Sequence, residues 1–270
     1  MGDFGIRPFA IAKGLQREMS RMTYLNFYGE KIDIPYICFY LNGEGKHILV
    51  DTGCSAKDYL EQVKRGSGKP LRAGGEVFKD VVDETPFEAM LDQLNLEAEQ
   101  IDYVIQTHLH WDHCMNTVKV PNAKIIVHEK EVLGGLPPHC FFGFSYAPKD
   151  YYDRLQRMPG FTAIKGEMEL LPGLGVIATP GHTPGGISVK VQTKKGIHII
   201  AGLCTVNLNY YLPKELEGEL GYSVIPPGCH TDPVQAYDSM MRIKREADRV
   251  LPLHEPMIMN EKVIGVVSPP

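Results

Sequence analysis

The segment HLHWDH, residues 108 to 113, places three histidines and one aspartate within six positions. It follows the apolar stretch DYVIQT, which is typical of a short buried strand. His108 and His110 are two positions apart, so in an extended chain their side chains point the same way. Asp112 and His113 follow where the chain turns into a helix, and they can face a second point nearby. The segment therefore predicts two neighbouring metal sites whose remaining ligands come from elsewhere in the chain.

Three further candidate ligands stand at the ends of predicted strands. They are His182 in TPGHTPGG, Cys204 in AGLCTVNL and His254 in LPLHEP. Imidazole and thiolate are good zinc donors, and loops at strand ends are where a rigid scaffold presents its chemistry. A lone histidine is more often a surface or core residue, but the Gly/Pro-bracketed loop around His182 favours a ligand.

The elements that must position these residues are mainly strands with intervening helices. The stretches 36–41 and 47–51 flank the turn-forming NGEG and predict a hairpin. Because strand-rich halves recur, we expect one α/β domain over residues 1–270, with two sheets packed face to face and helices outside.

Two helix starts carry capping signals. Thr85 can cap a helix over residues 85–94, with Glu88 reaching back in a capping box. Asp232 and Pro233 suit the cap and the first position of a second helix, which we expect to end near residue 247.

Composition narrows the classes of function. The chain has 270 residues, of which 43% are hydrophobic and 23% charged, as in a globular protein with a sizeable core. A net charge of −5 and scattered Lys and Arg give no basic footprint for nucleic acid or a membrane surface. No run approaches the ~18 apolar residues of a membrane span, and the start MGDFGIRPFA lacks the apolar core of a signal peptide. We expect a cytoplasmic protein with a small-molecule substrate.

A segment rich in Gly, Pro and aromatic residues, at about 134–160, has no clear period and predicts a lid or insertion. A pocket lined mainly by aromatic groups suits an apolar or ring-containing substrate. The candidate substrate-binding residues are Trp111, Phe141, Phe142, Tyr146 and Tyr211. The alternative is that the aromatic side chains form the core of the lid or a contact in a homodimer.

HLHWDH, together with PGHTPGG and LPLHEP, resembles the pattern of the metallo-β-lactamase superfamily, and ILVDTG (48–53) resembles its strand-end DTG. The resemblance runs from about residue 33 to 256 and is closest to the N-acyl homoserine lactonases. It implies an αβ/βα four-layer sandwich with metal ions at one edge. By matched position it assigns His108, His110 and His182 to a first metal. It assigns Asp112, His113 and His254 to a second.

The sequence departs from the family where most dinuclear members have a bridging aspartate. AGLC stands there, so Leu203 or Cys204 occupies that place, and leucine cannot ligate. We expect Cys204 to bind the second metal or to bridge both; the alternative is a buried bystander that leaves a weaker or mononuclear site. A thiolate favours zinc over manganese or magnesium, so two Zn²⁺ ions are expected, with iron as the alternative.

The resemblance implies a metal-dependent hydrolase in which a metal-bound hydroxide attacks a carbonyl and opens a cyclic ester, a lactone of the N-acyl homoserine lactone kind. Asp112 is placed both to ligate and to orient the hydroxide or shuttle a proton. Asn207, three positions after Cys204, stands where related lactonases have a tyrosine, and Tyr210 follows it closely. Asn207 and Tyr210 are therefore candidate oxyanion donors.

Two other classes of function stay open at this point. One is a hydrolase of another bond, either a thioesterase of the glyoxalase II type or a lactam hydrolase. The leaving group separates these enzymes from a lactonase, and the sequence does not encode it. The other is a metal-binding or redox protein without hydrolase activity that uses Cys204.

Overall fold

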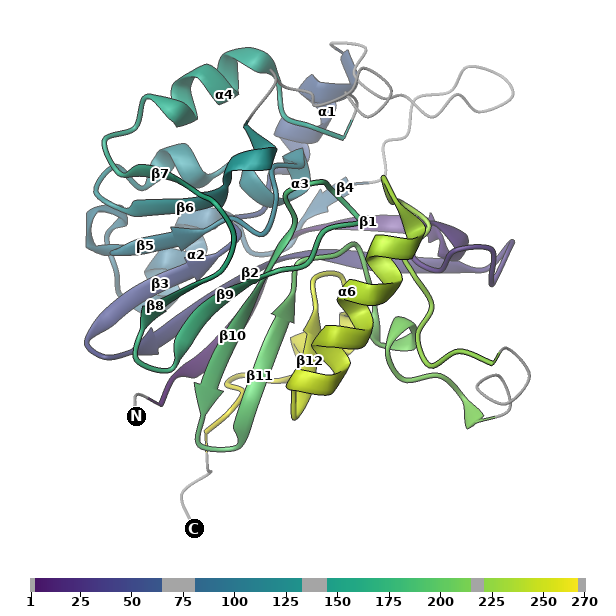
Figure 1. The fold of residues 1–270 in the computed structure, drawn as a ribbon. Coiled ribbons are helices and arrows are strands. Elements are labelled where there is room, and N and C mark those ends of the chain that lie inside the picture. The colour runs from purple at the N-terminus through teal and green to yellow at the C-terminus, as the bar shows by residue number, and fades with distance from the viewer. Residues whose placement is uncertain (1–2, 65–80, 133–144, 215–220, 267–270) are drawn as a thin grey trace.

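The structure is a computed structural model that describes residues 3–64, 81–132, 145–214 and 221–266. Within these ranges the strands form two sheets (Figure 1). The larger sheet has seven strands in the order β4-β1-β2-β3-β5-β6-β7, and the smaller has five in the order β12-β11-β10-β9-β8.

The strands of the larger sheet are β1 (Gly5–Glu18), β2 (Lys31–Gly43), β3 (Lys46–Val50), β4 (Val81–Asp83), β5 (Tyr103–Ile105), β6 (Lys124–His128) and β7 (Phe161–Ile164). Those of the smaller sheet are β8 (Met168–Leu171), β9 (Leu174–Ala178), β10 (Ile187–Thr193), β11 (Gly196–Ala201) and β12 (Arg249–Pro252). The helices are α1 (Ala56–Lys64), α2 (Phe87–Leu94), α3 (Trp111–Cys114), α4 (Lys149–Gln156) and α6 (Pro233–Glu246). Short 3-10 turns are η1 (Met19–Arg21), η2 (Ala98–Gln100), η3 (Thr117–Lys119), η4 (Glu129–Glu131), η6 (Asn207–Asn209) and η7 (Pro256–Asn260).

The direction of the strands decides where the candidate ligands meet. Strands β2 and β3 pair antiparallel, which confirms the predicted hairpin. Strands β3, β5, β6 and β7 are parallel to one another, and β11 is parallel to β12. Because parallel strands end at the same edge of a sheet, the loops that follow them share one end of the molecule. The candidate histidine and aspartate ligands lie in the loops after β5, β9 and β12, and Cys204 lies in the loop after β11. Strand β9 runs in the same direction as β11, because both pair antiparallel with β10.

The hydrophobic core lies in three layers that separate four layers of secondary structure. Side chains of β2 alternate: Ile37, Phe39 and Leu41 face the smaller sheet, while Cys38 and Tyr40 face the helices. The second group packs with buried residues of α2 and α4. Residues of α6 cover the outer face of the smaller sheet, as Figure 1 shows. The predicted αβ/βα four-layer sandwich is confirmed.

The two capping signals have different outcomes. Helix α6 begins at Pro233, and the carboxylate of Asp232 accepts from the amides of Val234 and Gln235, so that prediction is confirmed. The prediction of a capping box at Thr85 is wrong, because α2 begins at Phe87, two residues after Thr85, and no side chain caps its start. The backbone amide of Thr85 instead donates to the carbonyl of Ala10 in β1. Thr85 is therefore bound to the sheet and not to the helix.

Among the residues that the structure describes, none of the helices has the length and apolar character that crossing a membrane would require.

Candidate metal centre

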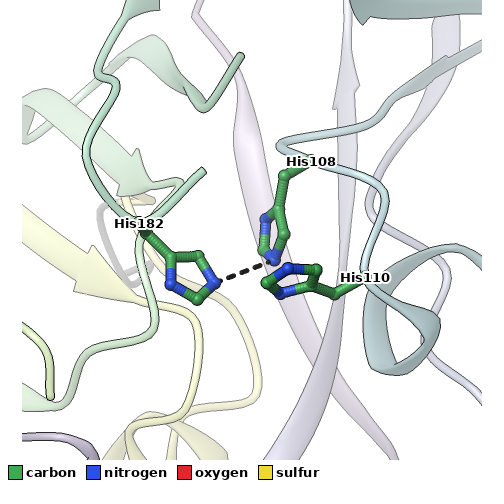
Figure 2. A group of neighbouring side chains, drawn as sticks. All are labelled: His108, His110 and His182. Carbon is green, nitrogen blue, oxygen red and sulfur yellow. Dashed lines mark hydrogen bonds between the residues drawn. The ribbon is translucent and has the colours of Figure 1, made fainter. Parts of the chain in front are cut away.

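Three imidazoles from two loops form the first candidate metal group. His108 and His110 follow β5, and His182 lies in the tight loop between β9 and β10. Each offers a ring nitrogen, and the three nitrogens lie within 4.8 Å of one another. Figure 2 shows the rings converging, with the Nε2 atoms of His108 and His182 3.3 Å apart. The structure therefore brings together the three residues that the sequence assigned to a first metal.

Asp112, His113 and His254 form the second candidate group. The first two lie in the single turn of α3, and His254 follows β12. Asp112 Oδ2 is 3.5 Å from His113 Nε2 and 3.9 Å from His254 Nε2. The rings of His108 and His113 have centroids 4.3 Å apart, so the two groups are neighbours.

Hydrogen bonds on the far side of the rings fix how the imidazoles point. His182 Nδ1 donates to the carbonyl of Cys229 (2.6 Å), and His254 Nδ1 donates to that of Pro35 (3.0 Å). His113 Nδ1 lies 2.9 Å from the Asp51 carboxylate. A proton held at Nδ1 leaves the Nε2 lone pair free, as in metal-binding histidines of proteins.

The donor set fits a divalent transition metal. Nε2 of His254 is fully buried and has no hydrogen-bond partner among the described residues, although a buried polar atom normally has one. A metal ion between Asp112, His113 and His254 would satisfy it. Three imidazoles in one group, and two imidazoles with a carboxylate in the other, are donors typical of zinc and iron sites.

Burial sets the protonation state of the ligands. It holds the pKa of His108 and His110 well below the usual range, with help from the neighbouring imidazoles. Burial also lowers the pKa of His182 and His254 to about 4. Burial acts on His113 in the same direction, but the carboxylates of Asp112 and Asp51 outweigh it and raise the pKa. Near pH 7 the first group is therefore neutral and ready to bind a cation.

Asp51, in the DTG motif, holds the segment of the candidate ligands through hydrogen bonds to Thr107 and His113. Its carboxylate accepts from the amide and the hydroxyl of Thr107, both at 2.8 Å, in addition to His113. Its backbone has a φ of 55°, a left-handed conformation that aspartate tolerates better than most residues. The sequence supplied the motif but gave Asp51 itself no role, because its contacts with Thr107 and His113 are distant along the chain.

Cys204 belongs to neither candidate group in the described part of the chain. Its thiol lies 3.7 Å from the sulfur of Met22, within a buried cluster that also holds Cys54 and Trp111. A hydrogen bond to Cys229 and burial raise its pKa well above the usual range. The metal-free thiol is therefore protonated, and metal ligation by Cys204 stays a prediction.

Cys229 is a neighbour of the centre that sequence reasoning missed. The hydrogen bond from Cys204 and the charge of Arg21 lower its pKa to about 6. Its carbonyl holds His182, as described above. A lone cysteine after PPG carries no local signal, and only the fold brings it to Cys204.

The predicted oxyanion donors lie in different places. The backbone N–H of Asn207, in η6, donates to the carboxylate of Glu255 at 2.6 Å, and Glu255 directly follows His254. Tyr210 is fully buried in the core under α6, which leaves its hydroxyl no access to a substrate. Tyr211 is 49% exposed, and its hydroxyl accepts from the amide of Val250 in β12. Of these three residues, only Asn207 has a hydrogen bond, within the described residues, to the neighbour of a ligand in either group, and that bond is made by its backbone.

The aromatic residues predicted to bind substrate also lie in different places. Phe141 and Phe142 lie outside the described residues, as do residues 134–144 of the predicted lid at 134–160. Tyr146 is 1% exposed and packs edge-on against His110, so it supports a ligand instead of lining a pocket. Trp111 is half-buried and packs against the rings of Tyr36 and Tyr59.

Tyr36 is a second residue that sequence reasoning missed. Its ring lies edge-on to His254 at 6.0 Å between centroids, and its hydroxyl accepts from Arg17 at 3.2 Å. Burial raises the pKa of this phenol, which therefore stays protonated. It is a polar side chain directly behind a ligand of the second group.

Comparison with known proteins places this geometry in context. Residues 36–198 match the metallo-beta-lactamase superfamily. An N-acyl homoserine lactonase from Bacillus sp is 27% identical over 225 residues, which are 83% of this chain and 81% of that protein. The crystal structure of a quorum-quenching N-acyl homoserine lactone lactonase superposes with a TM-score of 0.67 at 22% identity, covering 94% of this chain and 92% of that one. AidC, a dizinc quorum-quenching lactonase, superposes with a TM-score of 0.65 at 15% identity, covering 100% and 93%.

Proposed function

This chain belongs to the metallo-beta-lactamase superfamily, and we propose that it is a metal-dependent hydrolase that opens lactones of the N-acyl homoserine lactone kind. The observation that carries the proposal is the pair of adjacent three-ligand groups at one edge of the sandwich. The lactonase named above supports the bond type, since this chain matches it over most of both lengths.

Two divalent ions in these groups would supply Lewis acidity, which lowers the pKa of water and polarises an ester carbonyl. Zinc is the proposed metal, because five imidazoles and one carboxylate suit it and the structurally similar AidC is a dizinc enzyme. Cys204 is not needed to complete either group.

The chain's own residues would then handle protons and orientation. The Asp112 carboxylate is the most exposed of the six candidate ligand side chains, at 17%, so it borders the side from which a substrate can enter. Because Asp112 Oδ2 faces both imidazoles and would hold the metal, we propose that the other oxygen, Oδ1, takes a proton from the attacking water and passes it to the leaving alkoxide. The hydrogen bond that His113 Nδ1 donates to the Asp51 carboxylate keeps the imidazole beside Asp112 in place during that transfer. Asn207 is proposed to assist as a polar contact for the substrate.

A substrate panel tests the proposal. Purified protein loaded with zinc is assayed on an N-acyl homoserine lactone, a thioester and a β-lactam of similar size. We expect lactone hydrolysis to have the highest kcat/KM and to disappear in Asp112→Ala. Faster turnover of the thioester or lactam would overturn the proposed substrate class. Near-normal activity in Asp112→Ala would overturn its role.

A further inference from the structure

Glu131 is a buried carboxylate that the proposed chemistry does not use. It ends the turn η4 directly after β6, and its side chain is fully buried. Burial raises its pKa, and hydrogen bonds to the carboxylate act against that shift. Burying an acid is costly unless its oxygens are satisfied, so its partners indicate its role.

The two carboxylate oxygens bind the two loops that carry the first metal group. Oε2 accepts from the amide of Leu109 at 3.1 Å, and Leu109 lies between His108 and His110. Oε1 accepts from the amide of Gly185 at 2.9 Å, three residues after His182. One side chain thus spans the gap between the two loops.

The contacts around Glu131 show how closely the loops are held. A Cβ on Gly185 would lie 2.8 Å from both Oε1 and the backbone nitrogen of Glu131, so the His182 loop rests directly on this residue. The hydroxyl of Tyr146 donates to Oε2 at 3.4 Å. The ring of Tyr146 lies edge-on to His110, with centroids 4.7 Å apart.

We propose that Glu131 is a positioning residue for the first metal group, setting the separation of the loops that bring His108, His110 and His182 together. The inference rests on the metal binding in the proposed function and goes beyond it, because Glu131 itself touches no candidate ligand atom. A metal site loses affinity when its ligands are displaced by fractions of an ångström, and residues that orient ligands are worth about 10- to 100-fold in affinity.

A carboxylate suits this place better than an amide would. Both of its oxygens accept, and both backbone partners donate. Glutamine has one acceptor end and one donor end, so Glu131→Gln would turn an N–H group toward the amide of Leu109 or of Gly185. The carboxylate also places negative charge next to a group whose three ligands are all neutral.

Glu255 provides a matched control. It is 6% exposed and also accepts from two backbone amides, those of Asn207 at 2.6 Å and Met257 at 2.9 Å. It follows His254, however, and its contacts lie beside the second group. Glu255→Gln therefore disturbs a similar buried carboxylate without touching the loops of the first group.

The experiment measures metal affinity at the first group alone. In a His254→Ala background, where the second group is incomplete, zinc affinity is measured by competition with a chelator. Glu131→Gln is expected to weaken it by about 10- to 100-fold, the range for residues that orient ligands. Glu255→Gln is expected to leave it unchanged. Cobalt substitution adds a second readout, because the visible spectrum of Co²⁺ reports the ligand geometry that Glu131→Gln would alter.

Each outcome decides the matter. Unchanged zinc affinity and cobalt spectrum in Glu131→Gln, or an equal loss in Glu255→Gln, would overturn the inference while leaving the proposed function standing. No metal bound by the wild type would overturn both. A wild type that binds metal beside a His254→Ala protein that binds none would overturn the inference alone, because the first group would then not hold an ion by itself. If Glu131→Gln does not fold, Tyr146→Phe removes one donor to Oε2 and keeps the ring. It should weaken zinc in the same direction by less, and no effect would overturn the inference.

Discussion

The histidines of the centre combine burial with a neutral state, and this has a consequence for stability. His182 and His254 have pKa values near 4 in the folded protein, whereas histidine in an unfolded chain titrates near pH 6.5. Between these values the unfolded chain binds more protons, so stability is lost as the pH falls. Each histidine contributes up to about 1.4 kcal/mol per pH unit in that window.

We predict that metal-free protein loses free energy of unfolding from about pH 6.5 down to about pH 4, measured by urea titration. His254→Gln should have a shallower dependence, because one of the groups with a lowered pKa is gone. An identical slope in the variant and the wild type would show that His254 does not titrate as described.

For Cys204, the residue type and the position in the fold point to different roles. The type favours a metal ligand, but the thiol lies with Met22 and Cys229, outside both groups. We predict that Cys204→Ala still binds two metal ions per chain, as measured by elemental analysis. A metal content that falls to one would make the thiol a ligand and restore the expectation from the sequence.

At the scale of elements, the sequence correctly predicted helix caps and turns whose hydrogen-bond partners lie within a few residues. Asp232 caps α6 through amides two and three residues away, and the sequence shows both partners. Thr85 has an equally good capping signal but is bound by β1, a partner 75 residues earlier in the chain. The hairpin of β2 and β3 was predictable because its turn residues lie between its strands.

The loop of His182 depends on one glycine that a neighbouring element restricts. Gly181 has a φ of 127°, and a Cβ there would lie 2.2 Å from the backbone nitrogen of Ala236 in α6. Its carbonyl accepts from the amides of Thr231 and Asp232, which hold the loop against the start of that helix. The position therefore combines an unfavourable backbone conformation with a steric block.

We predict that Gly181→Ala destabilises the protein by more than about 1 kcal/mol and weakens zinc binding, because the helix or the His182 loop must move. Gly166→Ala is the matched control. Gly166 has a similar φ of 123° but nothing within 4 Å of a Cβ, so it reports the backbone strain alone. Equal losses in urea unfolding would show that contact with α6 does not matter.

At the scale of the whole molecule, two sheets bring the three separate loops that carry the six ligands to one edge. The resemblance of HLHWDH, PGHTPGG and LPLHEP predicted the six residues that the structure groups, and the four-layer fold with them. The groups behind these ligands could not be predicted this way. Glu131 and Cys229 act through contacts more than 20 residues away in sequence. Tyr210, an attractive phenol in the sequence, is enclosed by the packing of α6.

The proposed lactonase is tested most directly by adding zinc in known molar equivalents to metal-free protein and measuring the initial rate of N-acyl homoserine lactone opening. Because each three-ligand group would hold one ion, we predict no turnover without metal and a rate that reaches its maximum at two equivalents per chain. Turnover by the metal-free protein, or a protein with both ions bound that leaves the lactone intact, would contradict the proposed function.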